Sequence, residues 1–313
     1  MELNFTTLDV FTSTRFIGNP LSIIRVPQAF HDSVTEETKQ RIATEFNLSE
    51  IVFLHEVRDG ADHAVYDIFT PRSRMSFAGH PTIGTAIYVA QHPLQYPGLR
   101  KLKTIAGSVP FEYDHLTKTA EVDIPHDVYN HKAKLLPHPF PGPDTNPTNS
   151  EVVPLFSIVK GMAFNLVQLS NLETLALPTQ GLIPLPLLYE QEHLDPGSGW
   201  DVGYTGTFYF VDLGIDSSDS VNQTRLLRTR SIGSREDPGT GSASAALCSY
   251  LALKEGRERG RGPFRYHLVQ GVEFGRRCDI YVTVVRKGDG EGIEEVKLRG
   301  EAIEVMEGVL KVE

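Results

Sequence analysis

The sequence predicts an α+β fold of two pseudo-symmetric domains, each a β-barrel-like sheet wrapped around a central helix. Three observations predict it. Each half of the chain contains many short strand patterns and one helix rich in small and apolar residues. Each of these helices follows a glycine-containing loop, in "SFAGHPTIGTAIYVA" at 76–90 and "EDPGTGSASAALCSYLA" at 236–252. Neither helix has the polar face of a surface helix, so each is better placed inside a curled sheet.

The first half contains strands and two helices. Alternating or short apolar runs predict strands at 3–11, 21–27, 50–57, 63–70, 101–107, 109–114 and 119–124. The pattern at 35–46 predicts a helix with acidic residues in its first turn, and Ser33 with Glu36 predicts a capping box there. The apolar helix at 81–91 begins with Pro81, a residue suited to a first helical turn.

The second half repeats this pattern of strands and one apolar helix after a break at 126–150. The break contains "PHPFPGPDTNPTNS", and its prolines predict a surface loop. Strand patterns follow at 152–161, 164–170, 207–214, 224–233, 266–270, 278–286 and 293–299, with the apolar helix at 242–253. The stretch 184–206 predicts an irregular excursion over the surface. The final segment, "EAIEVMEGVLKVE", predicts two short strands around a glycine turn.

These patterns predict an N-terminal barrel domain at 1–125 and a C-terminal barrel domain at 126–301, with the active-site cleft between them. The terminal strand near 302–313 is able to return to the first domain. A length of 313 residues is comfortable for two domains, each large enough to bury a core.

Composition argues against several classes of protein. A net charge of −10 argues against a nucleic-acid partner, although a local basic pocket for a small anion stays possible. No apolar run is long enough for a membrane span. Two cysteines are too few for a disulfide framework, and the start of the chain lacks signal-peptide features, which predicts a cytoplasmic protein. Without an HExxH motif or a cysteine pair at ligand spacing, we expect no metal site.

The loops before the two apolar helices are candidates for anion binding. A helix N-terminus presents unpaired N–H groups and a partial positive charge, which suit a carboxylate. Gly79, Gly241 and Ser242 are small enough to let a ligand approach the backbone. If both N-termini face one cleft, they grip a carboxylated substrate from two sides. The alternative is that both are simple glycine corners.

Three further side chains can take part in proton transfer. We expect His80 to titrate near neutrality, as a histidine ordinarily does, but a lone histidine is more often structural. Asp237 lies before Pro238, where an acid commonly caps a turn. Glu50 lies at the start of an apolar strand and is either a solvated loop acid or, if held in an apolar cleft, a carboxyl whose pKa is raised towards neutrality. Singly none is specific, whereas their combination is.

At this point a family resemblance becomes visible. The segments "LDVFTSTRFIGNPLSII", "NLSEIVFL", "IFTPRSRMSFAGHPTIGTA", "RTRSIGSREDPGTGSASAAL" and "QGVEFGR" occur in the order and spacing of the PhzF-like phenazine-biosynthesis isomerase family, from about residue 7 to residue 283. The family is similar in fold to diaminopimelate epimerase, with two pseudo-symmetric domains and the active site between them. Its members are often homodimers, so the resemblance also implies a homodimer.

The resemblance implies an isomerase that needs no cofactor. In the phenazine enzyme a carboxylate removes a proton from one carbon of a cyclic acid and returns it to another. Carried onto this chain, the base is Glu50, His80 and Asp237 orient the substrate and relay or stabilise charge, and Ser242 holds polar groups. The backbone at Gly79, Gly241 and Ser242 then binds the substrate carboxylate.

Two alternatives stay open beside this interpretation. One is an epimerase or racemase acting on an amino-acid-like acid. Its two-cysteine form is disfavoured, because Cys248 falls in mid-helix and Cys278 begins a strand. The other is a non-catalytic small-molecule-binding homologue.

The chain also departs from the family pattern. Arg72, Arg74 and Ser76 replace the acidic residues and the proline usual before the AGHP motif, and "GRRC" replaces the usual Gly-Arg-Pro. We hypothesise that Arg72 or Arg74 favours a more anionic substrate, the alternative being two solvated surface arginines. These departures make the phenazine substrate itself doubtful.

Overall fold

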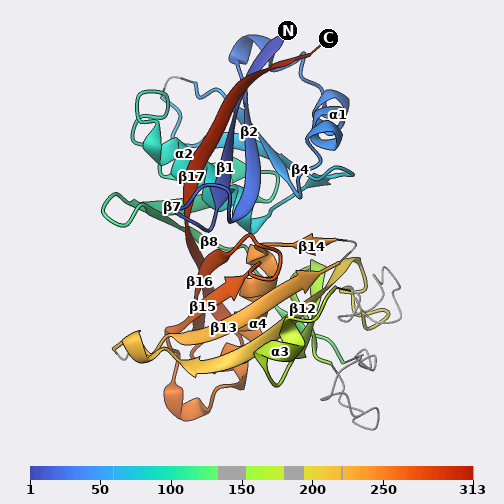
Figure 1. Cartoon of the computed structure of the whole chain (residues 1–313), viewed down its shortest axis with the longest axis vertical. Coiled ribbons are helices and arrows are strands. Elements are labelled where there is room, and N and C mark those ends of the chain that lie inside the picture. Colours follow the sequence, from blue (N-terminus) through green and yellow to red (C-terminus); the bar gives the residue numbers. More distant parts are fainter. Residues whose placement is uncertain (59, 133–152, 180–193, 220, 234, 313) are drawn as a thin grey trace. The chain divides into compact units, whose positions relative to one another are not determined.

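The computed structural model describes residues 1–58, 60–132, 153–179, 194–219, 221–233 and 235–312 (Figure 1). It contains two compact units: unit 1 comprises Met1–Ile124 and Leu298–Glu313, and unit 2 comprises Pro125–Lys297. The predicted proline-rich loop at 137–150 lies outside the described residues, as does the predicted excursion up to residue 193.

Eight of the strands described in unit 1 close into a barrel. They are β1 (Glu2–Val10), β2 (Asn19–Val26), β3 (Ile51–His55), β4 (Ala64–Phe69), β6 (Lys101–Thr104), β7 (Gly107–Asp114), β8 (Thr119–Asp123) and part of β17 (Ile293–Lys311). They pair in this order, and β17 closes the ring by pairing with both β8 and β1. The β2–β3 and β4–β6 pairs are parallel, and the short β5 (Arg74–Met75) pairs antiparallel with the end of β4.

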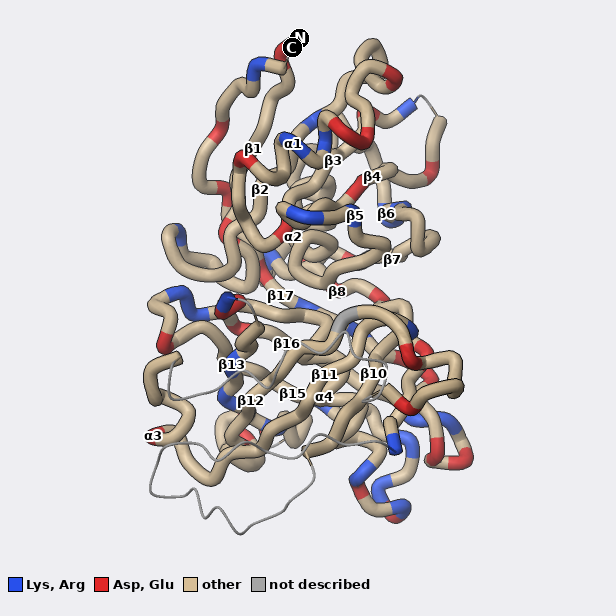
Figure 2. Tube along the Cα trace, turned by 90° about the vertical axis from the view of Figure 1, so that its right-hand side faces the viewer, with Lys and Arg blue, Asp and Glu red and all other residues tan. Residues whose placement is uncertain are grey.

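The apolar helix α2 (Gly79–Gln91) fills this barrel. All its residues except the last are buried, and it packs against β1, β2, β3, β7 and β8. Gly84 lets the helix approach closely, because a Cβ there would lie 2.5 Å from Leu21 Cδ2. The helix contains no charged residue, in contrast to the loops of unit 1 (Figure 2). The prediction of a buried central helix with Pro81 in its first turn is confirmed.

The outer helix α1 (Glu36–Phe46) packs on β3 and β4, but its cap differs from the prediction. Thr35 is the N-cap residue, and its hydroxyl accepts a hydrogen bond from the N–H of Thr38. Since the helix begins at Glu36, Ser33 lies two residues before the cap and the predicted Ser33–Glu36 capping box is wrong.

The predicted glycine turn near the end of the chain is also wrong. β17 runs through Gly308 as one strand, which pairs along β1 so that the two chain ends lie side by side (Figure 1). Gly308 lies opposite Phe5, and a Cβ there would be 2.6 Å from Phe5 Cζ. The glycine therefore makes room for an aromatic ring and does not end the strand.

Unit 2 has a second curled sheet. Its strands are β9 (Tyr129–Asn130), β10 (Leu155–Val159), β11 (Gly161–Gln168), β12 (Gly203–Ile215), β13 (Arg225–Ile232), β14 (Glu236–Asp237), β15 (Phe264–Gln270) and β16 (Cys278–Arg286). Pairing runs from β9 through β13 to β15 and β16, and β14 pairs only with β13 among the pairings described. The apolar helix α4 (Gly241–Lys254) packs against β10, β11, β15 and β16, which come from both ends of this series. The sheet therefore curls around α4, and the predicted α+β fold is confirmed.

Short helical segments complete both units. α3 (Leu172–Leu175) packs on β12 and β13. 3₁₀ turns lie at Gln28–Phe30 in unit 1, and at Ser217–Asp219 and Arg257–Arg259 in unit 2. Within the described ranges, no helix combines the length and the apolar character needed to cross a membrane.

Candidate functional site

The N-terminus of α2 leaves backbone donors available. Ala78 occupies the N-cap position in an extended conformation and has no side chain that can cap the helix. The Thr82 hydroxyl donates back to the Ala78 carbonyl at 2.7 Å, so it does not cap the first turn either. Pro81 has no N–H group, which leaves the amides of Gly79 and His80 as donors that the helix itself does not use.

The barrel brings Glu50 to this helix N-terminus. Glu50 directly precedes β3, and β3 runs parallel to β2, so Asn19 at the start of β2 lies at the same end of the sheet. Glu50 Oε2 lies 3.6 Å from His80 Nδ1, and Asn19 Nδ2 lies 3.3 Å from the same nitrogen. Ser49 Oγ reaches Asn19 Oδ1 at 3.5 Å. Asn19 and His80, which are 61 residues apart in the sequence, therefore meet at this site.

Burial determines the charge of His80. Its side chain is 4% exposed, and this burial lowers its pKa to about 3. The expected titration of His80 near neutrality is therefore wrong: its imidazole is neutral at neutral pH, and its contact with Glu50 is not an ion pair. An amide NH₂ group donates hydrogen bonds, so Asn19 donates to Nδ1 and the imidazole proton resides on Nε2. That buried Nε2–H has no acceptor among the residues the structure describes.

The N-terminus of α4 is held differently. Its N-cap Thr240 also provides no side-chain cap: its hydroxyl donates to Asp237 Oδ2 at 2.6 Å and accepts from Gln270 Nε2 at 3.0 Å. The buried Gly241 and the half-buried Ser242 follow as the first two helical residues. Their amides therefore resemble those of Gly79 and His80 in lacking an intrahelical acceptor.

Gln270 fastens this loop. Its Nε2 donates to the Asp237 carbonyl at 2.8 Å and to Thr240 Oγ1 at 3.0 Å, and its Oε1 accepts from the Thr240 N–H at 3.1 Å. The next residue, Gly271, adopts φ +75°, and a Cβ there would lie 2.6 Å from the Pro238 carbonyl oxygen. Gln270 and Gly271 together therefore fix the loop at residues 237–240, Gln270 by hydrogen bonds and Gly271 by close packing.

Two residues of the site were not predicted. Asn19 and Gln270 lie within the "GNP" and "QGVEFGR" segments that carry the family resemblance, which was the only signal for them. Neither residue has a local pattern that reveals its partner.

The structure assembles the predicted residues in two groups. Gly79, His80 and Glu50 meet in unit 1, whereas Asp237, Gly241 and Ser242 lie together in unit 2. A single cleft shared by both groups stays a prediction. The buried cysteines lie where the sequence predicted, Cys248 within α4 and Cys278 at the start of β16. Among the described residues, no three His, Cys, Asp or Glu side chains are grouped to hold a metal ion.

The two arginines before α2 differ from each other. Arg74 donates to Asp67 and, at 2.8 Å, to Glu36. Its charge is thus already matched by carboxylates of β4 and α1, which gives it a structural role. Arg72 is exposed, and its possible influence on substrate selection stays a hypothesis.

Comparison with known proteins gives consistent matches. The family model described as phenazine biosynthesis-like protein matches residues 8–152 and 208–308. An uncharacterized isomerase of Pasteurella multocida is 32% identical over 275 residues, which cover 86% of this chain and 82% of the relative. A trans-2,3-dihydro-3-hydroxyanthranilate isomerase of Pseudomonas fluorescens is 26% identical, with 98% and 99% covered.

A solved structure supports the fold. The Bacillus anthracis phenazine biosynthesis protein of the PhzF family superimposes with a TM-score of 0.70 at 20% identity, and both chains are covered completely. The fold resemblance inferred from the sequence motifs is therefore confirmed.

Proposed function

The chain is an isomerase that belongs to the phenazine biosynthesis-like protein family, and we propose that it shifts a proton on a small carboxylated metabolite through the single carboxylate of Glu50. The observation that carries this proposal is the contact of Glu50 Oε2 with Nδ1 of a buried, neutral His80, at 3.6 Å. A carboxylate there lies beside the amide donors that open α2, where a substrate carboxylate is held well.

In this proposal Glu50 removes a proton from one carbon of the substrate and returns it to another. The same carboxyl group accepts and donates the proton, so the balance needs neither an oxidant nor a cofactor. Because Asn19 already uses the lone pair of His80 Nδ1, protonated Glu50 keeps its proton for return to the substrate. General acid–base assistance of this kind contributes roughly 10²- to 10⁴-fold to the rate.

The remaining predicted residues bind and orient the substrate. The Nε2–H of His80 is a buried donor suited to a substrate oxygen on which negative charge develops. Asp237 orients the substrate and stabilises charge, and Ser242 holds its polar groups. The amides of Gly79, Gly241 and Ser242 hold its carboxylate.

The substrate class is a small carboxylated compound. The Pseudomonas fluorescens relative is named for trans-2,3-dihydro-3-hydroxyanthranilate, which is therefore the first acid to test. The departures near Arg72 and in the "GRRC" segment favour a related acid over this same one.

Solvent-deuterium exchange tests the proposal. The wild-type protein is incubated in D₂O with a panel of carboxylated metabolites headed by trans-2,3-dihydro-3-hydroxyanthranilate, and label is located by NMR. We expect Glu50→Gln to abolish labelling while ligand binding persists. Glu45→Gln, on the exposed face of α1, is the matched control and should label at the wild-type rate. Exchange that persists in Glu50→Gln would place the base elsewhere.

The position of the label separates the alternatives. Label on a new carbon identifies a positional isomerase, whereas label at the original stereocentre identifies an epimerase or racemase. Binding without labelling identifies a non-catalytic homologue. The homodimer implied by the family resemblance stays a prediction that light scattering can test.

A further inference from the structure

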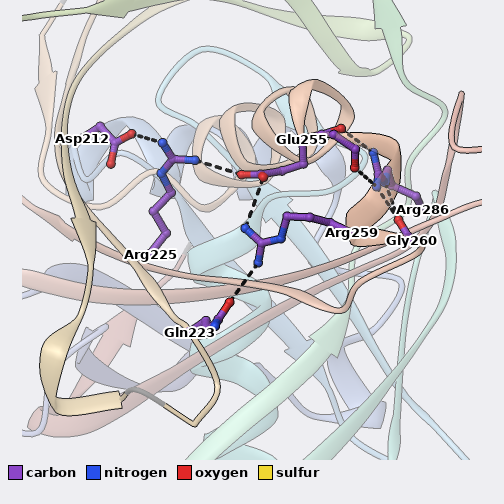
Figure 3. Close-up of polar contacts among 8 residues, drawn as sticks. Asp212, Gln223, Arg225, Glu255, Arg259, Gly260 and Arg286 are labelled. Atoms are coloured by element: carbon purple, nitrogen blue, oxygen red, sulfur yellow. Dashed lines mark hydrogen bonds and ion pairs between the residues drawn. The ribbon is translucent and has the colours of Figure 1, made fainter.

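Strand β13 carries an arginine near each of its ends. Arg225 donates to Asp212 and, at 3.0 Å, to Glu255, which is the C-cap residue of α4 (Figure 3). Arg286 adds four hydrogen bonds to three carbonyl groups at the same end of the helix, including one of 2.8 Å to the Glu255 carbonyl. A cation near a helix C-terminus complements the helix dipole. This network anchors the end of α4 that is remote from the predicted site residues.

Arg230, five residues further along β13, is anchored in another way. Its side chain is 3% exposed, and its Nε and Nη2 donate to the two oxygens of Glu236, both at 2.8 Å. Its Nη1 donates to the carbonyls of Leu175 and Leu177, both at 2.7 Å. The guanidinium fork is therefore bidentate on one carboxylate and fully buried, an arrangement that lysine cannot reproduce.

Glu236 is the direct neighbour of Asp237. Both residues form β14, which pairs with β13 through Ile232↔Glu236 and Ser231↔Asp237. Successive side chains of a strand point to opposite faces, so a clamp on Glu236 determines where the Asp237 carboxylate points. Asp237 in turn accepts a hydrogen bond from the hydroxyl of Thr240, the N-cap residue of α4.

We propose that Arg230 and Glu236 are positioning residues, whose buried pair sets the location of Asp237 and of the first turn of α4. The inference rests on the role of Asp237 in the proposed function. Neither residue is assigned a contact with substrate. The alternative is that the pair merely stabilises unit 2, as the Arg225 network does at the other end of α4.

A double-mutant cycle separates these roles. Arg230→Lys and Asp237→Asn are made singly and together, and kcat/KM is measured with trans-2,3-dihydro-3-hydroxyanthranilate as probe. Misplacement of Asp237 by Arg230→Lys should lower kcat/KM by about 10²-fold. In the Asp237→Asn background, Arg230→Lys should lower kcat/KM by no more than about twofold, because Arg230 acts through Asp237. A twofold change is within the scatter of such cycles. Arg225→Lys is the matched control and should lower thermal stability without changing kcat/KM.

Amide hydrogen exchange provides a readout that needs no ligand. Arg230→Lys should accelerate exchange at residues 236–242, whereas Arg225→Lys should not. Glu236→Gln keeps the shape of the side chain and should show the same pattern if Arg230→Lys fails to fold. Three results would each overturn the inference: additive effects in the cycle, an Asp237→Asn variant with wild-type kcat/KM, or unchanged amide exchange at residues 236–242 in Arg230→Lys. None of these outcomes depends on Glu50→Gln, so failure here is distinct from failure of the proposed base.

Discussion

Helices α2 and α4 begin alike but are held by different side chains. Both have an N-cap residue that makes no side-chain cap, and both start with a glycine. Around α2 the polar contacts of His80 are long, at 3.3 and 3.6 Å. Around α4 the Thr240–Asp237–Gln270 contacts are short, between 2.6 and 3.1 Å. In the proposed function the first arrangement holds the groups that handle the proton, whereas the second fixes a loop.

The surface helix α1 shows what these two helices lack. Its N-cap Thr35 accepts from the Thr38 N–H, and this hydrogen bond satisfies one of the donors that α2 and α4 leave available. Uncapped starts are therefore not imposed by the chain in general. They occur at the two buried helices that follow the AGHP and DPGTG segments, and this difference supports a ligand-binding role for both starts.

Replacing His80 should have the largest effect, because it removes the neutral imidazole from the α2 start. In His80→Leu the side chain keeps a similar size but can neither pass a proton nor donate the hydrogen bond of Nε2–H. We expect kcat to fall by roughly 10²- to 10⁴-fold. Steady-state kinetics and circular dichroism test this together. A folded variant with near-wild-type kcat would mean that the two helix starts do not differ in proton handling.

Loss of Gln270 should destabilise the loop that precedes α4 and thereby the fold. Gln270→Leu leaves the Asp237 carbonyl and the Thr240 N–H without their buried partner. We expect the free energy of unfolding to fall by roughly 3 kcal/mol, from unsatisfied polar groups. Urea denaturation measures it, and Gln28→Leu, at an exposed position, should change little. Equal stability of both variants would show that the α4 loop does not depend on Gln270.

Sequence patterns were informative where structure depends on local composition. The buried helices α2 and α4 were predictable because nearly every residue in them is small or apolar, which only a buried position tolerates. Glu50 and His80 were identified as a pair only through the family resemblance. Their residue types alone fitted a surface acid and a structural histidine equally well.

The features that were not predicted depend on contacts between residues far apart in the sequence, which hydrophobic periodicity does not reveal. Gln270 finds its partners about 30 residues away, and the Arg230 fork needs β13 and β14 to pair first. Gly308 illustrates a different ambiguity. A glycine can serve a turn or make room for a neighbour, and only the register of β17 on β1 shows that Phe5 requires the space.

Acid titration sharpens the comparison, because only the α2 start contains a buried histidine. The pKa of His80 is about 3 in the fold and near 6.5 when unfolded, so the unfolded chain binds one more proton between these values. This contribution to stability is complete above about pH 6.5 and is lost as the pH falls towards 3. We expect it to make stability fall by up to about 1.4 kcal/mol per pH unit in that window. Denaturation of wild type and His80→Leu at several pH values gives the difference, and identical slopes would contradict a neutral His80.

Adding a cap to α2 should have the smallest effect and tests the comparison with α1 directly. A serine in Ala78→Ser can accept from the His80 N–H, since Pro81 has none to offer. We expect the helix to gain about 1 kcal/mol and the KM for the labelled acid to rise about fivefold, because the cap competes with the substrate carboxylate. Thr35→Ala in α1 should lose about 1 kcal/mol with KM unchanged. If Ala78→Ser stabilised the protein without raising KM, the amides at the start of α2 would not be the ones that hold the carboxylate.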